Sequence, residues 1–355
     1  MELGSDRFGA VTELPPLPHE EAAARRRPWL GYVMVLTAAT LFAVNGVVSK
    51  VILASGLSSL RRTEVRLTGA ALGLVLVLAL ASPGRLRVTR GELAFLAAFG
   101  ILGLALVQWL YFLAIHRLEI GIALLIQYLA PVLVALWARF VMHRVVRRRL
   151  WVALALAVAG LALVVQIWEG GSTLSGVGVA ASLGAAVAFA AYIILAERGV
   201  ERRDAVSLSA YGFVFGALFF ACIQPWWSFP GHIVDDRVSL LGNLASSHLP
   251  VWGLMTWMVV LGTIVPFGLF VGSLRHIPAT RASILAMFEP VVATVVAWAW
   301  LDESLAAAQV VGGVVVLCGI ALAQTARETS SRPPMPAAAP VSGGGARPAP
   351  RARPG

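Results

Sequence analysis

Two segments, Leu-Ile-Gln-Tyr-Leu-Ala-Pro at residues 125–131 and Ile-Leu-Ala-Met-Phe-Glu-Pro at residues 284–290, occupy the same place in two long apolar stretches of this chain. A shift of the sequence that lays Pro131 on Pro290, made without a gap, also superposes Gly103 on Gly262. We call it the proline shift, because both segments end in proline, which interrupts the hydrogen bonding of a helix. The chain is therefore predicted to contain one structural unit twice.

A second, shorter shift supports this repeat. It lays Phe-Ala-Val-Asn at 42–45 over Phe-Ala-Ala-Tyr at 189–192, and we call it the first-helix shift. A longer linker around 224–249 explains the difference between the two shifts. The proline shift also places Gly160 on Gly319. We expect the first repeat at residues 29–167 and the second at residues 168–324.

The composition is that of a membrane protein. Hydrophobic residues make up 59% of the 355 residues and charged residues only 13%, unlike a soluble domain. Apolar stretches of about 20 residues can cross a bilayer core of about 30 Å as helices. The predicted fold class is all-α, a polytopic membrane protein with ten transmembrane helices. The ten begin near Trp29, Arg61, Glu92, Ile120, Leu150, Val177, Val206, Pro250, Pro278 and Ala306.

Five helices per repeat is an odd number, so the two repeats must cross the membrane in opposite directions. The loop charges agree, because the connection at residues 139–149 is strongly basic while its repeat partner around Asp302 and Glu303 is acidic. Basic residues favour the cytoplasmic side. They predict that both termini are cytoplasmic. Many secondary transporters consist of inverted repeats, with the substrate site near the midplane and alternating access by rocking of the repeats.

The remaining features of the chain concern its surroundings. The net charge of +10 comes from arginines in short loops, which indicates topology and phospholipid contact and no nucleic-acid partner. Residues 1–28 are expected to form a cytoplasmic tail, and residues 325–355, rich in Pro, Ala, Gly, Ser and Arg, a disordered basic tail. The scarcity of lysine beside abundant alanine, arginine and glycine favours a bacterial cytoplasmic membrane. The sequence does not indicate an oligomeric state.

Motifs in both repeats carry a family resemblance. The second repeat ends with Phe-Glu-Pro-Val at 288–291 and Trp-Leu-Asp-Glu-Ser-Leu at 300–305, followed by a glycine-bearing last helix. The first repeat opens with Leu-Phe-Ala-Val-Asn-Gly-Val-Val-Ser-Lys at 41–50 and has Arg66 near the start of its second helix. Over residues 29–324 the chain resembles the EamA-like branch of the drug/metabolite transporter superfamily. The resemblance implies ten helices and secondary-active transport, often export, of amino acids or other small or hydrophobic metabolites.

Glu289 is a carboxyl residue deep inside an apolar stretch, where a charge is costly and usually faces a bundle interior or a watery pathway. Its repeat equivalent is Ala130. One interpretation is a structural, hydrogen-bonded acid. The other is a pathway residue that exchanges protons and couples transport to them.

Lys50 and Arg66 are the cationic candidates. Lys50 is the sole lysine and lies twenty-one residues after Trp29, about 31 Å along a helix, so it either binds an anionic solute or extends to the interface. Arg66 either pairs with an anionic group or anchors the second helix. Polar residues inside other spans are candidates for substrate contact or for hydrogen bonds between helices. These polar residues are Asn45, Gln108, Tyr111, Gln127, Tyr128 and Tyr192. Three prolines, Pro131, Pro266 and Pro290, are candidates for helix breaks at a gate.

Two other classes stay open as alternatives. A non-transporting membrane receptor or scaffold would use the same bundle, and an intramembrane enzyme would need paired catalytic groups at helical depth. The sequence has no His-Glu-x-x-His or Gly-x-Ser-x-Gly pattern and no nucleotide-binding loop of the Walker type. We therefore expect no enzyme activity, cofactor or metal.

Overall fold

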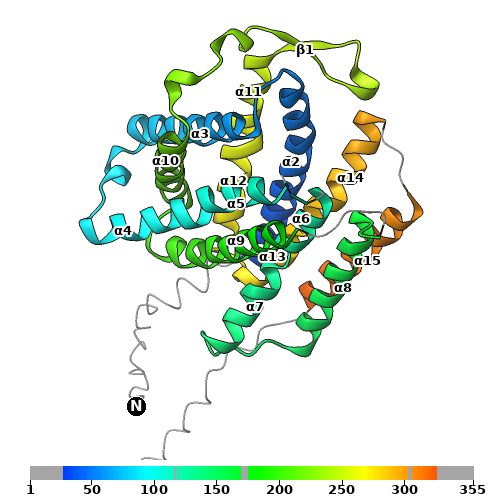
Figure 1. The fold of residues 1–355 in the computed structure, drawn as a ribbon. Helices are drawn as coiled ribbons and strands as arrows, with labels where there is room; N and C mark the ends of the chain where they lie inside the picture. The colour runs from blue at the N-terminus through cyan, green and yellow to red at the C-terminus, as the bar shows by residue number, and fades with distance from the viewer. Residues whose placement is uncertain (1–26, 116, 119, 169–174, 303–305, 326–355) are drawn as a thin grey trace, which may run out of the picture.

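The computed structural model describes residues 27–115, 117–118, 120–168, 175–302 and 306–325, and the tails predicted at 1–28 and 325–355 lie almost wholly outside these residues. Nearly all described residues are helical (Figure 1). Nine helical segments in the described part of the chain are long and apolar enough to span a membrane, and a shorter apolar helix follows at Ala307–Ala323. The all-α polytopic architecture is confirmed, while the count of ten spans stays a prediction.

The first repeat forms five helical segments in sequence order. The third is continued through a π-helical stretch, the fourth is broken in the middle, and a short 3-10 turn, η1 (Pro83–Leu86), precedes the third. The segments are α2 (Pro28–Ala54), α3 (Ser59–Ala81), α4 (Arg90–Ala98) with η2 (Phe99–Ala105) and α5 (Leu106–Ile115), α6 (Ile120–Gln127) with α7 (Ala130–Phe140), and α8 (Arg148–Val165).

The second repeat has the same order of segments. Its linker between the second and third helices carries a two-stranded antiparallel sheet of β1 (Arg237–Ser239) and β2 (His248–Pro250), with 3-10 turns η3 (Trp226–Ser228), η4 (Gly231–Ile233) and η5 (Gly242–Leu244). The helices are α9 (Gly176–Arg202), α10 (Ala205–Ile223), α11 (Val251–Val259) with η6 (Val260–Ile264) and α12 (Val265–Ser273), α13 (Ala279–Ala286) with α14 (Phe288–Leu301), and α15 (Ala307–Thr325).

The second helix begins earlier than its apolar core indicates. Ser58 caps α3, since its side-chain oxygen accepts a hydrogen bond from the Arg61 backbone N–H at 3.2 Å. This cap starts the helix at Ser59, so Arg62 and Arg66 lie on the helix itself, although their charges resemble those of a loop. The extra turns make α3 long enough to cross the membrane.

Prolines explain the breaks in the fourth helix of each repeat. A proline ring clashes with the carbonyl four residues earlier, which is Gln127 for Pro131 and Ala286 for Pro290. The helices α6 and α13 end at these two residues. The breaks therefore fall at positions that the proline shift superposes.

The third helix of each repeat contains a π-helical stretch, and the two stretches, η2 and η6, are also related by the proline shift. Gly103 in η2 packs against Tyr192, and Gly262 in η6 packs against Asn45 so closely that a methyl group there would overlap the amide. Asn45 and Tyr192 correspond under the first-helix shift. The two contacts are thus pseudo-symmetric copies, as an inverted repeat requires.

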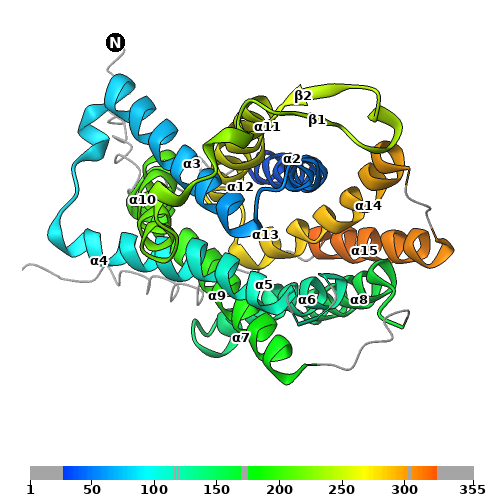
Figure 2. The same cartoon turned by 45° about the horizontal axis from the view of Figure 1, so that its top comes forward.

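The last helices of the two repeats, α8 and α15, run side by side (Figures 1 and 2). Gly160 of α8 meets the backbone of Gly312 and Val316, and Gly319 of α15 meets the backbone of Ala153. Small residues allow such close approach of membrane helices.

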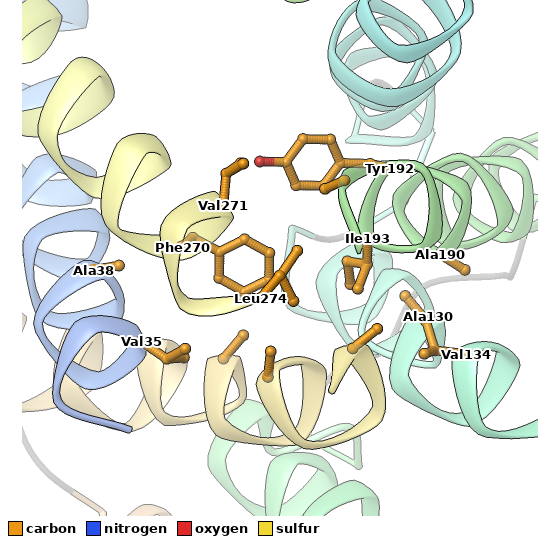
Figure 3. Close-up of a cluster of buried hydrophobic side chains, with 14 of the residues drawn as sticks. Val35, Ala38, Ala130, Val134, Ala190, Tyr192, Ile193, Phe270, Val271 and Leu274 are labelled. Atoms are coloured by element: carbon orange, nitrogen blue, oxygen red, sulfur yellow. The ribbon is translucent and has the colours of Figure 1, made fainter. Parts of the chain in front are cut away.

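A hydrophobic cluster fills one part of the bundle beside these contacts. The cluster includes Val35 of α2, Ile193 of α9, Val134 of α7, and Phe270 of α12 with Leu274 directly after that helix (Figure 3). Four helices from both repeats therefore share this cluster.

Candidate functional site

A cavity of about 740 Å³ lies between the two repeats. Its wall is built by helices of both, namely α2, α3, α5 with η2, α6, α8, α9, α12, α13, α14 and α15. All nine polar or charged residues selected from the sequence line it, and so does Pro290, whereas Pro131 and Pro266 are not among its lining residues. The nine are Asn45, Lys50, Arg66, Gln108, Tyr111, Gln127, Tyr128, Tyr192 and Glu289.

The cavity extends toward one side of the bundle. Its lining includes Ser59 at the start of α3, Ile115 at the end of α5 and Val165 at the end of α8, which are helix ends on one side of the membrane. On α9 the last lining residue is Tyr192, well before that helix ends at Arg202. Toward the opposite side the lining stops short of the helix ends, at Val35 on α2 and at Phe270 on α12.

This opposite side is crossed by polar bonds between the repeats. Arg144 Nη1 lies 3.2 Å from Glu197 Oε1, which also accepts a hydrogen bond from the Ala279 backbone N–H at 3.2 Å. Arg281 donates a hydrogen bond to the Tyr32 hydroxyl at 3.2 Å. We call the Arg144–Glu197–Ala279 contact the latch, because it joins the first repeat to α9 and α13 of the second.

Glu289 lies in the first turn of α14, directly after the helix break at Met287. The N-terminus of a helix carries partial positive charge, which favours a carboxylate there. Tyr128, at the equivalent break of the first repeat, is its hydrogen-bond partner, and Arg66 interacts with it electrostatically. The two broken helices thus meet through one side-chain contact in the cavity wall.

Arg66 is held by the π-helical stretch η6. Its Nε–H donates a hydrogen bond to Thr263 Oγ1 at 2.9 Å, and the Thr263 hydroxyl donates to the Met258 carbonyl at 2.8 Å. A π-helical stretch changes which carbonyls are free within a helix and often marks functional sites. The Arg66 guanidinium lies over Phe267, 5.5 Å from the ring centroid.

Arg62 is a cavity residue that the sequence analysis did not select. It lies one helical turn before Arg66 and 5.9 Å from the centroid of the Phe112 ring. Its spacing of four residues from Arg66, on a helix predicted to begin near Arg61, is the signal that could have identified it.

Aromatic side chains form a continuous part of the wall, and the sequence analysis did not select most of them. Phe42 packs edge-on against Phe267 at 5.0 Å between centroids, Tyr192 lies 5.9 Å from Phe267 and 6.1 Å from Phe270, and Phe189 lies 6.2 Å from Tyr192. Phe42 and Phe189 correspond under the first-helix shift, and this match could have identified both as candidates for the cavity wall.

Several polar atoms in the wall lack a hydrogen-bond partner among the described residues. They are Asn45 Oδ1, Gln127 Oε1 and the Tyr192 hydroxyl. A buried polar group without a partner costs about 1–3 kcal/mol, so a polar solute in the cavity would find groups ready to bind it. Lys50 is exposed and lies near the end of α2, just before its last turn, where it lines the cavity. Within the described residues there is no group of three or more His, Cys, Asp or Glu side chains that could hold a metal.

An apolar helical bundle of two repeats around a central cavity, lined by apolar and aromatic residues with a few polar and charged ones, is the architecture of multi-spanning membrane transporters. This chain belongs to the EamA-like transporter family, whose family model matches residues 29–166 and 176–325. Among its relatives is the threonine/homoserine exporter RhtA of Escherichia coli (strain K12), 27% identical over 73% of this chain and 81% of that protein. An uncharacterised inner membrane transporter, YicL of Salmonella typhimurium, is 25% identical over 82% of this chain and 94% of its own length.

The fold is also that of a solved structure. A crystal structure covering 82% of this chain and 96% of its own chain superposes with a TM-score of 0.67 at 16% sequence identity. At that identity the likeness concerns the fold alone.

Proposed function

We propose that this chain is a secondary-active exporter of small organic solutes, amino acids among them, that works by alternating access and is coupled to protons. The observation that carries the proposal is the cavity of about 740 Å³ between the repeats, which reaches one side of the bundle and is closed from the other. A relative named as a threonine/homoserine exporter supports amino acids as substrates.

Alternating access follows from the repeat. Two inverted repeats can exchange conformations, which moves the opening of a central site from one face to the other. The basic loops favour a cytoplasmic position for the closed face, with Arg144 and Arg281, so in this proposal the described state faces outward. Opening inward requires that the latch and the Arg281–Tyr32 hydrogen bond break.

Glu289 is the proton-coupling residue in this proposal. Its carboxyl group lies in the cavity wall beside Tyr128 and Arg66. A solute ammonium group and a proton would compete for the same carboxylate, so binding of a proton from outside would release the solute there. Return of the protonated protein would then carry the proton inward.

The test is counterflow in proteoliposomes, with labelled L-threonine, L-homoserine and a panel of other amino acids. An exporter exchanges at least one labelled solute across the bilayer, whereas a receptor or scaffold binds without exchange. The variant Glu289→Gln keeps the side-chain shape but removes the titratable group and the charge that faces the solute ammonium. At saturating solute it should still exchange, with lower affinity, and it should lose its response to an imposed pH gradient. Gradient dependence equal to that of the unmodified protein would refute the coupling role.

A further inference from the structure

Two arginines of α3, Arg62 and Arg66, lie together in the cavity wall. We propose that this pair binds the carboxylate of the transported solute, and that the aromatic wall beside it holds an apolar body attached to that carboxylate. The inference rests on the proposed function and names the substrate class of the same site, an organic carboxylate with an apolar or aromatic body.

The spacing of the two arginines creates a need for an anion. Residues four apart lie on the same face of a helix, and like charges there repel each other, more strongly where the dielectric constant is low. Neither arginine forms a salt bridge within the described part of the chain. Glu289 interacts electrostatically with Arg66 but is hydrogen-bonded to Tyr128, and one carboxylate cannot neutralise two guanidinium groups.

Arg61, on the same helix, shows what a structural arginine looks like here. It is buried, and its guanidinium forms a salt bridge with Glu64 at 2.6 Å and donates hydrogen bonds to the Pro225 carbonyl at 3.0 Å and to the Ser228 hydroxyl. The contrast with its neighbours indicates that the partners of Arg62 and Arg66 are not supplied by the described residues.

Arg66 is oriented for a planar anion. Its Nε–H is committed to Thr263 Oγ1 at 2.9 Å, and among the described residues its two terminal nitrogens have no hydrogen-bond acceptor. A guanidinium that is fixed at Nε keeps a fork of N–H donors that matches the two oxygens of a carboxylate. The π-helical stretch that places Thr263 therefore also positions this fork.

The surroundings of the pair select what the carboxylate is attached to. The Arg62 guanidinium lies over the ring of Phe112, and the Arg66 guanidinium lies over the ring of Phe267. The Phe267 ring in turn contacts the rings of Phe42 and Tyr192. A carboxylate bound by both arginines would bring its apolar body onto these rings. Offset or edge-on ring pairs stabilise such contacts beyond the area that they bury.

Equilibrium binding to the purified full-length protein in nanodiscs tests the proposal with three probes that share a phenyl body. They are 3-phenylpropionate, L-phenylalanine and 2-phenylethylamine. Both carboxylates should bind, and the amine should bind at least about tenfold more weakly, because a buried charge that loses its ionic partner is costly. Arg62→Gln and Arg66→Gln should each weaken binding of 3-phenylpropionate by about tenfold or more.

Two further variants control the result. Arg66→Lys keeps the charge and loses the fork, so its affinity should fall between those of the unmodified protein and Arg66→Gln. Arg149→Gln removes an exposed arginine outside the cavity and should bind as the unmodified protein does. Melting curves of every variant identify a loss caused by misfolding, and in that case Arg62→Gln and Arg66→Lys decide the question.

The proposal is overturned if 3-phenylpropionate does not bind the unmodified protein, if 2-phenylethylamine binds equally well, or if folded Arg62→Gln and Arg66→Lys both bind the carboxylate normally. Binding is measured without turnover, which separates this test from that of transport. Carboxylate binding with no counterflow of any solute would refute the proposed exporter function and support the carboxylate site. Counterflow of solutes without carboxylate binding would support the exporter function and refute the carboxylate site.

Discussion

The latch between the repeats gives a measurable prediction about the closed face. The two substitutions Glu197→Gln and Glu197→Ala divide its contacts, because a glutamine oxygen can still accept the Ala279 N–H, 3.2 Å away in the present structure, while alanine removes both the ion pair and the hydrogen bond. Under the proposed mechanism, each loss raises the population of the state that opens this face.

The magnitude follows from the exposure of the partners. The side chain of Arg144 is 44% exposed and that of Glu197 12%, so solvent screening limits the ion pair to about 0.2–1 kcal/mol. The hydrogen bond from a backbone N–H to a charged acceptor contributes about 1.5 kcal/mol at the lower end of its range. Glu197→Gln should therefore raise the minor population by about 1.4- to fivefold, and Glu197→Ala by about thirtyfold, at about 1.4 kcal/mol per factor of ten.

The assay uses a cysteine at Ser49, which lines the cavity, in a variant without Cys222 and Cys318. An impermeant maleimide added to the closed face can reach position 49 only through the opened state, so the labelling rate reports that population directly. Arg149→Gln, which removes an exposed arginine of the same basic connection that is not part of the latch, serves as the control and should leave the rate nearly unchanged. Equal rates for the parent, Glu197→Gln and Glu197→Ala, with unchanged melting temperatures, would refute the reasoning.

Two further predictions concern stability. Gly160→Ala should lower the melting temperature, because the new methyl group would lie 2.7 Å from the Gly312 carbonyl oxygen and overpacking of this kind costs about 1–3 kcal/mol of stability. Gly268→Ala, where a new methyl group meets nothing within 4 Å, should raise the melting temperature. A drop of equal size in both variants would contradict the close-contact argument. Burial, then the charges of Arg275 and Arg27, lower the pKa of His276, so the unfolded chain takes up this proton at a higher pH than the folded one. Stability should therefore fall as pH drops below about 6.5, and the change in melting temperature from pH 7.5 to 5.5 should be smaller in His276→Asn; an identical change in both would remove His276 as a cause.

The sequence predicted those features that repeat. Pro131 and Pro290 stand at equivalent positions, and each has a helix break directly before it for the same steric reason. The matched pairs of the two shifts also anticipated pseudo-symmetric packing, since Gly103 contacts Tyr192 as Gly262 contacts Asn45. A residue such as proline or glycine that recurs at equivalent positions constrains one helix in each repeat. A few such pairs were therefore sufficient to predict the repeat despite the weak sequence identity between its two copies.

What the sequence could not supply were contacts that depend on distance in space. The latch joins residues 53 positions apart, and no periodicity connects Arg144 with Glu197. Thr263 orients Arg66 from 197 positions away through a π-helical stretch, for which residue types give no signal. Arg62 was not selected, although the second helix was predicted to begin near Arg61. The Ser58 cap starts that helix at Ser59 and places Arg62 on it, one turn before Arg66.

The charges of the cavity break the symmetry that the backbone keeps. Glu289 corresponds to Ala130, and under the first-helix shift Arg66 corresponds to Phe213. Phe213 is buried, and its ring centroid lies 5.2 Å from that of Phe267. The Arg66 guanidinium lies 5.5 Å from the centroid of the same Phe267 ring. Two nearly equivalent backbones make the inward- and outward-facing states close in energy under the proposed mechanism. A charge present in only one repeat then interacts differently in the two states, and a ligand shifts such an equilibrium only by its differential affinity. In the proposed mechanism, the solute and the proton can therefore drive the exchange because the groups that bind them occur in one repeat only.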